Sequence, residues 1–502
     1  MNKIFRYILG FAMIASLGSC ENNFLDVNTD PNNPPAEVGT PALIFPSAVA
    51  STAVRVGGEY AILGGMWSQY WTQSNAANQY KFIDAYNVNS DKFRGSFNEM
   101  FSGALNDYNF VITKAQENED WIYLLMGTVM KAYSYEVMVD LYDKVPYTEA
   151  FQGDANLTPV YDDGDFIYRE LIKEIDNALA QDFNAATNSV PDKTDFVFSG
   201  DATKWMQFAN TLKLKFYLRM VNAFPAEAKA GVESVFANGI GFLTEDAAMT
   251  QFEDGPDKSN PFYEYNYRQL NVATNLRASK TLMSFLLANS DPRLDAIYTP
   301  GSGGQVALDQ GNFNVSSTVV DPNSVSVAQQ SPLEPVRFIS AAESYFMQAE
   351  AVARYGVAGD AKALYDLGVH AAFNQFAFDP ELYKDVLPNL DPTVLLASGG
   401  AYEYPNGTFE HNLEAIITQK WVSCVGSHAL EGFFEQNRTG YPSVSAVYSD
   451  DSEYKAGQFV YSKEGITNGL FPKRLIFSGD EYSRNPNTPT EVPVTGKVWW
   501  AK

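Results

Sequence analysis

The sequence is poor in the side chains that most often bind metals or form cross-links. Its 502 residues include two cysteines, Cys20 and Cys424, and three histidines, His370, His411 and His428. The histidines are not spaced as a metal site, and Cys424 has no neighbouring thiolate to form a ligand pair. We therefore expect no metal ion, no cofactor and a fold held by packing, without an intramolecular disulfide.

Sequence motifs of common enzyme chemistry are also missing. The chain contains no Gly-x-Ser-x-Gly elbow, no P-loop and no dinucleotide-binding fingerprint. His370, which stands beside Ala371 and Ala372, is interpreted as a core histidine, and Cys424 as a small buried side chain. One enzyme class stays open, because a glycosidase needs only two suitably placed carboxylic acids and the chain has 60 acidic residues.

Basic residues are few relative to acidic ones. There are 35 Lys and Arg against 60 Asp and Glu, which gives a formal net charge of −25. Such a surface repels nucleic acid, so we expect no nucleic-acid partner. Aromatic residues are plentiful instead, with 34 Phe, 29 Tyr and 7 Trp. This composition favours neutral, ring-shaped ligands over anions.

The N-terminus carries a targeting signal. Residues 4–15 are apolar apart from Arg6 and Tyr7, Lys3 precedes them, and Leu-Gly-Ser-Cys follows, ending at Cys20. This run is too short to span a membrane, which takes about 20 apolar residues, and it is typical of a secretory signal peptide. The position of the cysteine resembles a lipobox, so we predict lipidation of Cys20. The alternative is an ordinary signal peptide with a chance cysteine.

These features predict three parts. Residues 1–19 are the lipoprotein signal peptide, residues 20–41 are the lipidated N-terminus and an Asn-, Asp- and Pro-rich tether, and residues 42–502 are a single domain. No clean linker divides the third part. Lipid would then anchor the protein to a membrane surface without spanning it.

Helical periodicity dominates the predicted domain. Residues 121–142 read as one long helix, and residues 341–355 and 360–377 read as a helical hairpin around Gly356 and Gly359. Two further helices are predicted from a capping aspartate and apolar residues at helical spacing. These are Asp163 with Ile167, Leu171, Ile175 and Leu179, and Asp201 with Trp205, Phe208, Leu212 and Phe216. Residues 251–270, 299–336 and 440–498 are predicted to be long loops or short strands, and such loops often carry function.

Two stretches, Trp67–Tyr80 and Asn260–Asn271, combine aromatic rings with amides or arginine. This combination suits a sugar, because a ring packs on its C–H face and an amide binds its hydroxyls. We interpret Tyr263, Tyr265 and Tyr267 as an extended segment with three rings on one side, about 6 to 7 Å apart. The alternative is that these aromatics pack against the protein, as expected for Trp67. The ligand-binding candidates are Trp71, Asn75, Tyr80, Tyr263, Tyr265, Tyr267 and Arg268.

Eight blocks, each weak alone, together resemble the SusD/RagB family of outer-membrane lipoproteins of Bacteroidota, and most closely its SusD-like group two. They are VNTDPNNP (Val27–Pro34), DLYDKVPYTEAF (Asp140–Phe151), TPVYDD (Thr158–Asp163), GDATKWMQFANTLKLKFYLRM (Gly200–Met220), ASKTLMSFLLANSDPRL (Ala278–Leu294), AIITQKWV (Ala415–Val422), EGFFEQNRTGYP (Glu431–Pro442) and PKRLIFSGDEYSRNP (Pro472–Pro486). We read the blocks themselves as structural, with Arg438 pairing with a carboxylate.

The resemblance implies a mostly α fold, in which tetratricopeptide-like helix pairs stack and a second lobe is rich in loops. It also implies a surface-exposed, non-catalytic protein of the outer membrane. Such a protein captures oligosaccharides, or less often peptides, and delivers them to a SusC-like TonB-dependent transporter. A surface glycosidase and a helical adhesion or assembly scaffold remain the alternatives.

Overall fold

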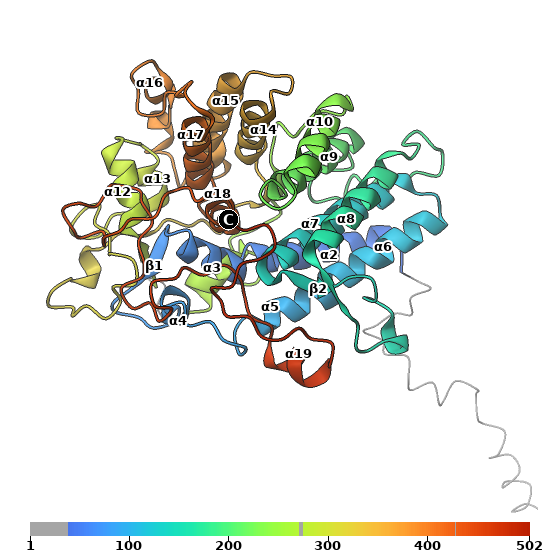
Figure 1. The fold of residues 1–502 in the computed structure, drawn as a ribbon, viewed down its shortest axis with the longest axis horizontal. Helices are drawn as coiled ribbons and strands as arrows, with labels where there is room; N and C mark the ends of the chain where they lie inside the picture. The colour runs from blue at the N-terminus through green and yellow to red at the C-terminus, as the bar shows by residue number, and fades with distance from the viewer. Residues whose placement is uncertain (1–38, 271–274, 427) are drawn as a thin grey trace, which may run out of the picture.

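The computed structural model describes residues 39–270, 275–426 and 428–502 and is mostly helical. In Figure 1 the longer helices follow one another in an arc from α6 and α2, through α7 to α10, to α14, α15 and α17. The longer helices are α2 (Pro41–Val56), α3 (Glu59–Trp67), α6 (Asn106–Glu117), α7 (Trp121–Tyr142), α8 (Gly164–Leu179), α9 (Ala202–Arg219), α10 (Pro225–Ala237), α12 (Lys280–Ala288), α14 (Ala341–Tyr355), α15 (Ala361–Asn374), α17 (Phe409–Ser423) and α18 (Ala429–Thr439).

Short elements occupy the loop-rich lobe and the connections. The short α-helices are α4 (Lys81–Asp84), α5 (Arg94–Glu99), α11 (Pro261–Tyr263), α13 (Leu294–Ile297), α16 (Thr393–Leu396) and α19 (Gly479–Arg484). The π- and 3-10 turns are η1 (Met100–Leu105), η2 (Gly153–Ala155), η3 (Glu264–Arg268), η4 (Pro322–Ser324), η5 (Gln375–Phe378) and η6 (Leu387–Asn389). The strands are β1 (Trp71–Gln73), β2 (Lys144–Pro146), β3 (Tyr161–Asp163), β4 (Ala247–Met249), β5 (Leu276–Ala278), β6 (Tyr298–Thr299), β7 (Val327–Ala328) and β8 (Val336–Ile339).

Helices that are close in sequence pack against each other, as expected for stacked helix pairs. α6 packs on α7, α9 on α10, α14 on α15, and α17 on α18. The predicted hairpin is confirmed, since α14 ends at Gly356 in a left-handed conformation (φ 64°) and the Asp360 side chain caps α15. Glycine fits the position of Gly356 because it adopts a positive φ without steric cost.

α7 lies at the centre of the helical layer. The helix predicted for residues 121–142 is confirmed, and it is buried along almost its whole length between α2, α6, α8 and α9. A helix that is apolar on all sides has no face for water and is therefore placed inside a protein. This is why α7 positions the surrounding helices.

The two predicted caps have different outcomes. Asp201 caps α9 by accepting hydrogen bonds from the backbone N–H groups of Thr203 and Lys204, as predicted. Asp163 does stand at the start of α8, but its side chain makes no capping bond and pairs with Lys144 at 2.5 Å instead. The cap is lost because residues 161–163 form β3, which pairs antiparallel with β2 and brings Lys144 opposite Asp163.

The strands are short and mostly tie loops together. A four-stranded antiparallel sheet has the order β1-β5-β7-β6, with Trp71 opposite Ala278 and Gln73 opposite Leu276. β4 pairs with β8, which leads directly into α14. The sheet thus joins chain segments that lie more than 200 residues apart at the base of the loop-rich lobe.

Two predictions about local structure are wrong. Residues 261–268 are helical, as α11 followed by the π-turn η3, so Tyr263, Tyr265 and Tyr267 do not alternate along an extended chain. Asn260 caps this turn by accepting from the Tyr263 N–H. His370 is exposed, because it stands at the edge of the face of α15 that Val369, Ala372 and Phe373 bury.

Candidate functional site

A cleft of about 590 Å³ is lined by residues of α4 and of the segments on either side of it. We call it the amide cleft, because three of its lining side chains are carboxamides. It is lined by Asn78, Gln79, Lys81, Phe82, Ala85, Asn87, Lys92, Phe313 and Glu464. Three separate chain segments, residues 78–92, the turn at Phe313 and the turn at Glu464, therefore form its walls.

The amides of the cleft are available to a ligand. Asn78, Gln79 and Asn87 are exposed. No hydrogen bond joins their side chains to another residue in the described ranges. A carboxamide both donates and accepts hydrogen bonds, so each can bind a pair of neighbouring hydroxyl groups.

Two aromatic residues line the cleft, each with a lysine over its ring. Phe313 is only 5 % exposed, so the half-buried ring of Phe82 is the one that is open to a ligand. The Lys81 ammonium lies 5.0 Å from the centroid of Phe313 and donates to Asn314 Oδ1 at 3.1 Å. The Lys92 ammonium lies 4.6 Å from the centroid of Phe82. These cation–π contacts fix the rings and place positive charge at the cleft edge.

Asn75, a predicted ligand-binding residue, holds a wall of the cleft. Its side-chain amide donates to the carbonyls of Val320 (2.9 Å) and Val315 (3.4 Å), next to the turn that carries Phe313. Tyr80 precedes α4 and is only 7 % exposed; its hydroxyl donates to the Tyr265 carbonyl at 3.4 Å. Both residues lie near the cleft, but neither is among the side chains that line it.

Trp71 lies in the protein core and presents no face to a ligand. It is 1 % exposed, lies in β1, and meets Tyr298 edge-on at 5.5 Å between ring centroids. Trp67 and Tyr70 are buried as well. The aromatic residues of the stretch 67–80 thus pack against the protein, which was the alternative interpretation.

Of the three predicted tyrosines, the structure brings two together. Tyr263 and Tyr267 are one helical turn apart and stack at 5.0 Å with an interplanar angle of 9°, and Arg268 lies 5.3 Å from the Tyr263 ring centroid. The Tyr267 hydroxyl donates to the Ala328 carbonyl. Tyr265 points elsewhere and accepts from Arg55 Nη1 at 3.1 Å. The ligand-binding role of these residues stays a prediction, without the three-ring platform.

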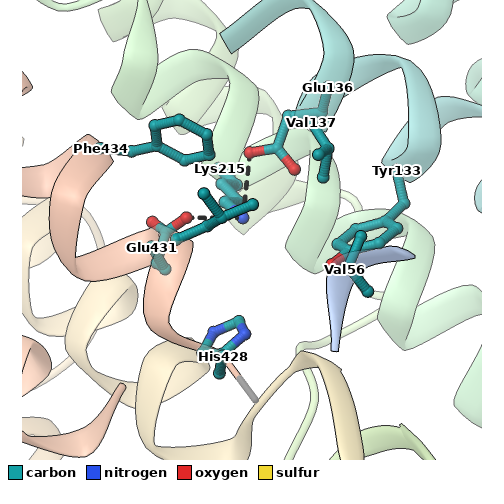
Figure 2. A pocket seen from close by; sticks show the side chains of 9 residues that line it. Val56, Tyr133, Glu136, Val137, Lys215, His428, Glu431 and Phe434 are labelled. Atoms are coloured by element: carbon teal, nitrogen blue, oxygen red, sulfur yellow. Dashed lines mark ion pairs between the residues drawn. The ribbon is translucent and has the colours of Figure 1, made fainter. Parts of the chain in front are cut away.

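A second group of polar residues lies in the core and was not predicted. We call it the buried charge network, formed by Glu136, Asp140, Lys215, Arg219, Glu343, Glu350, Lys420, His428, Glu431, Glu435 and Arg438, all of them buried. Figure 2 shows its centre, where Lys215 Nζ lies 3.0 Å from Glu136 and 2.9 Å from Glu431, with His428 across a small cavity. The cavity has about 20 Å³, which is room for one water and none for an organic ligand.

The charges of this network shift the pKa values of its members in opposite directions. Burial raises the pKa of Glu136 to about 8, although Lys215 and Arg219 oppose the shift. Burial also acts on Glu343, but Lys215, His428 and Lys420 together hold the pKa of that carboxyl well below its usual range. The network connects α7, α9, α14, α17 and α18, so its role is structural.

A family model matches the chain over residues 32–461 and is described as starch-binding associating with outer membrane. The chain belongs to the SusD-like family. The prediction from the eight sequence blocks is confirmed, and the match covers the helical layer and every lining residue of the amide cleft except Glu464.

Solved structures of SusD-like proteins share this fold. A chitin-binding protein has 24 % identity and a TM-score of 0.71, covering 92 % of this chain and 100 % of its own. A SusD homologue from Bacteroides uniformis has 22 % identity and a TM-score of 0.70 (91 % and 99 %). A chitin-binding SusD homologue from Flavobacterium johnsoniae has 22 % identity and a TM-score of 0.70 (91 % and 98 %). No curated protein sequence matches the chain. The predicted mostly α, SusD-like fold is confirmed.

The described residues contain neither a metal site nor a membrane-spanning helix. Among the described residues, no three His, Cys, Asp or Glu side chains gather in a way that could hold a metal ion. Within the same ranges, no helix is both long and apolar enough to cross a bilayer.

The sequence analysis located only part of the lining of the amide cleft. It selected the stretch that ends at Tyr80, whereas the lining amides and Phe82 continue to residue 92. Phe313 and Glu464 do lie in the predicted loops 299–336 and 440–498. Asn78 and Gln79 lie inside the selected stretch, and the residues that it missed are those that follow it, above all Phe82, Asn87 and Lys92.

Proposed function

We propose that this chain is a lipid-anchored, non-catalytic protein of the cell surface that binds oligosaccharides in the amide cleft and delivers them to a SusC-like TonB-dependent transporter. The observation that carries the proposal is the combination of three exposed carboxamides with the half-buried ring of Phe82 in one open cleft. It agrees with the family description, which is of starch binding, and with the names of two structural neighbours, which are of chitin binding.

The chemistry of the cleft favours a neutral glycan over a peptide. Sugar hydroxyls need partners that donate and accept, which Asn78, Gln79 and Asn87 supply, and the C–H faces of sugar rings pack on aromatic rings. Two lysines and Glu464 leave the cleft with charges of both signs, so it offers no uniform field for a charged chain. A peptide remains an outcome of the test.

The lining residues also argue against a glycosidase. Hydrolysis of a glycosidic bond commonly uses two carboxyl groups on either side of the bond, about 5 to 10 Å apart. Glu464 is the one carboxylate among the residues that line the cleft. The cleft therefore supports binding without cleavage.

The membrane and transporter parts of the proposal rest on the N-terminus and on the family. Cys20 lies outside the described residues, whose first helix, α2, begins at Pro41. Lipidation at Cys20 would hold the folded part at the outer membrane by acyl chains. A surface position above a transporter barrel would then let a ligand released from the cleft enter the pore.

Calorimetry of the mature chain with the hexamers of N-acetylglucosamine and of α-1,4-linked glucose tests the binding site. We expect Phe82→Ala combined with Asn87→Ala to weaken binding roughly thirtyfold, from one lost stacking contact and one lost hydrogen bond of about 1 kcal/mol each. The matched control is Phe166→Ala with Asn184→Ala, an exposed ring and amide in the helical layer, which should bind as wild type does.

Three results would overturn parts of the proposal. Unchanged affinity of the cleft variant would place the site elsewhere. Binding of a mixed peptide library in preference to both sugars would replace the glycan. Shortened sugars after long incubation with purified protein would make it an enzyme.

A further inference from the structure

Asp84 lies beneath the amide cleft at the point where its walls meet. The side chain is 0 % exposed. Its Oδ2 accepts from the Thr72 hydroxyl (2.7 Å) and from the Gln73 N–H (2.8 Å), and its Oδ1 accepts from Gln310 Nε2 at 2.6 Å. One carboxylate thus joins α4, β1 and the segment before Phe313.

Each wall of the cleft connects to this carboxylate through a few bonds. The first wall includes Asp84 itself, at the end of the helix that presents Phe82. The second wall follows Gln310, and the N–H of Gly311 donates to the Thr72 hydroxyl at 3.0 Å. This bond and that from Gln310 Nε2 to Asp84 fix the start of the turn that carries Phe313.

The third wall is attached to the first two by its backbone. The Lys463 N–H donates to the Gln310 carbonyl (3.0 Å), and the Ile466 N–H donates to the Ala85 carbonyl (3.1 Å). Glu464 stands between these two bonds. The spacing of the three walls therefore depends on the unit formed by Asp84 and Gln310.

No cation of the described residues neutralises Asp84. Within the described ranges, no Lys, Arg or His forms an ion pair with it; Asp309 and Lys463, on the neighbouring segments, pair with each other at 3.0 Å. Tyr86 is the titratable group beside it, and burial, then Asp84, raise the pKa of that phenol. Burial raises the pKa of Asp84 to about 6, although its hydrogen bonds lower it.

We propose that Asp84 is a positioning residue of the glycan site, whose ionised carboxylate holds the three walls at the spacing that binds the ligand and whose protonation loosens them. This inference rests on the proposed function. A carboxylate accepts from all its donors, whereas a protonated oxygen carries an O–H of its own. The backbone N–H of Gln73 cannot accept, and Gln310 could turn its oxygen to Asp84 only by losing the bond that this oxygen accepts from the Ser279 hydroxyl at 2.8 Å. A proton on Asp84 therefore weakens the contacts between walls.

Hydrogen–deuterium exchange measures the walls without a ligand. Corrected for intrinsic rates, exchange at residues 78–92 and 310–313 should rise about tenfold in wild type between pH 7.5 and pH 5.0. In Asp84→Asn it should be raised at both pH values and nearly independent of pH. Affinity for the two sugar hexamers should follow the same pattern, falling about tenfold in wild type at pH 5.0.

Asp107→Asn is the matched control, because burial also raises the pKa of Asp107 to about 6 but this residue lies on α6, which packs on α2 and α7. It should keep the wild-type pH dependence of the walls. If Asp84→Asn fails to fold, Thr72→Val tests the inference in its place, because the Thr72 hydroxyl lowers the pKa of Asp84. Its loss should move the midpoint of the pH effect upward.

Equal exchange of the walls at both pH values, in wild type and Asp84→Asn alike, would overturn the inference. So would an unchanged midpoint in Thr72→Val. The proposed function fails separately, when the sugars bind equally well to the Phe82→Ala, Asn87→Ala variant or do not bind to wild type, because the exchange readout needs no ligand.

Discussion

Arg438 and Glu350 face each other inside the protein through two parallel hydrogen bonds. Arg438 Nη1 lies 2.8 Å from Glu350 Oε1, Nη2 lies 2.6 Å from Oε2, and both side chains are 1 % exposed. The prediction that Arg438 pairs with a carboxylate is confirmed. The pair joins α18 to α14, and Glu435 adds a further contact to the same guanidinium.

Removing the charge of Glu350 should destabilise the fold strongly. Glu350→Gln leaves a buried guanidinium only partly compensated, and breaking a buried pair in this way costs about 3 to 5 kcal/mol. Urea unfolding followed by circular dichroism measures the loss. Glu381→Gln, which breaks the exposed pair with Lys384, should change the unfolding free energy by less than about 0.5 kcal/mol. Equal effects of the two substitutions would contradict this expectation.

Trp71→Ala should act on stability. The ring is buried between Tyr298 and Phe262, so its removal leaves a cavity and should cost about 3 to 5 kcal/mol. Thermal unfolding would detect the change. Weakened sugar binding with an unchanged melting temperature would return Trp71 to the list of ligand contacts.

The helical conformation of residues 261–268 changes what a double substitution should do. Tyr265→Ala with Tyr267→Ala removes the hydroxyls that bond to Arg55 and to the Ala328 carbonyl, together with two partly buried rings. We expect the unfolding free energy to fall by about 2 to 4 kcal/mol. If the amide cleft alone binds the ligand, as proposed, sugar affinity at 15 °C should stay within about twofold of wild type. Weak binding by a variant of normal stability would show that these rings contact the ligand.

Stability should fall as the pH rises from 6.5 to 8, and Glu136 should be one cause. Burial raises the pKa of Glu136 to about 8 from the usual 4.5, so the folded state holds this proton more tightly than the unfolded chain does. The resulting stability is complete below pH 4.5 and is lost as the pH rises through about 8. Glu136→Gln should flatten the melting temperature between pH 6.5 and 8; a slope equal to that of wild type would argue against this origin.

Lipidation and the transporter are tested together in cells. Wild type should incorporate an alkyne fatty acid and should be recovered from mild detergent with a large TonB-dependent barrel. Cys20→Ala should take up no label and leave the membrane fraction. Label in Cys20→Ala would contradict lipidation at this cysteine. Recovery of wild type only as a free monomer in several detergents would contradict the transporter partner.

The sequence predicted the helical scaffold well, because amphipathic spacing and caps act locally. α7, α9 and the hairpin of α14 and α15 could be located from residues within each segment. The extended conformation predicted for the Tyr263 segment was wrong, because alternating tyrosines fit both a strand and a helical turn. The cap at Asn260 favours the helical turn. The pairing of Asp84 with Gln310 could not be predicted, since it joins residues more than 200 positions apart.

Different residues contact the ligand and position the walls of the cleft, which has a consequence for evolution and for engineering. The three amides that would meet a ligand are exposed, whereas Asp84 and Gln310, which set the spacing of the walls, are buried. Exchange of positions 78, 79 and 87 should therefore alter specificity at little cost to folding. A library of variants at these three positions, with Asp84 and its hydrogen bonds unchanged, offers a route to receptors for other glycans.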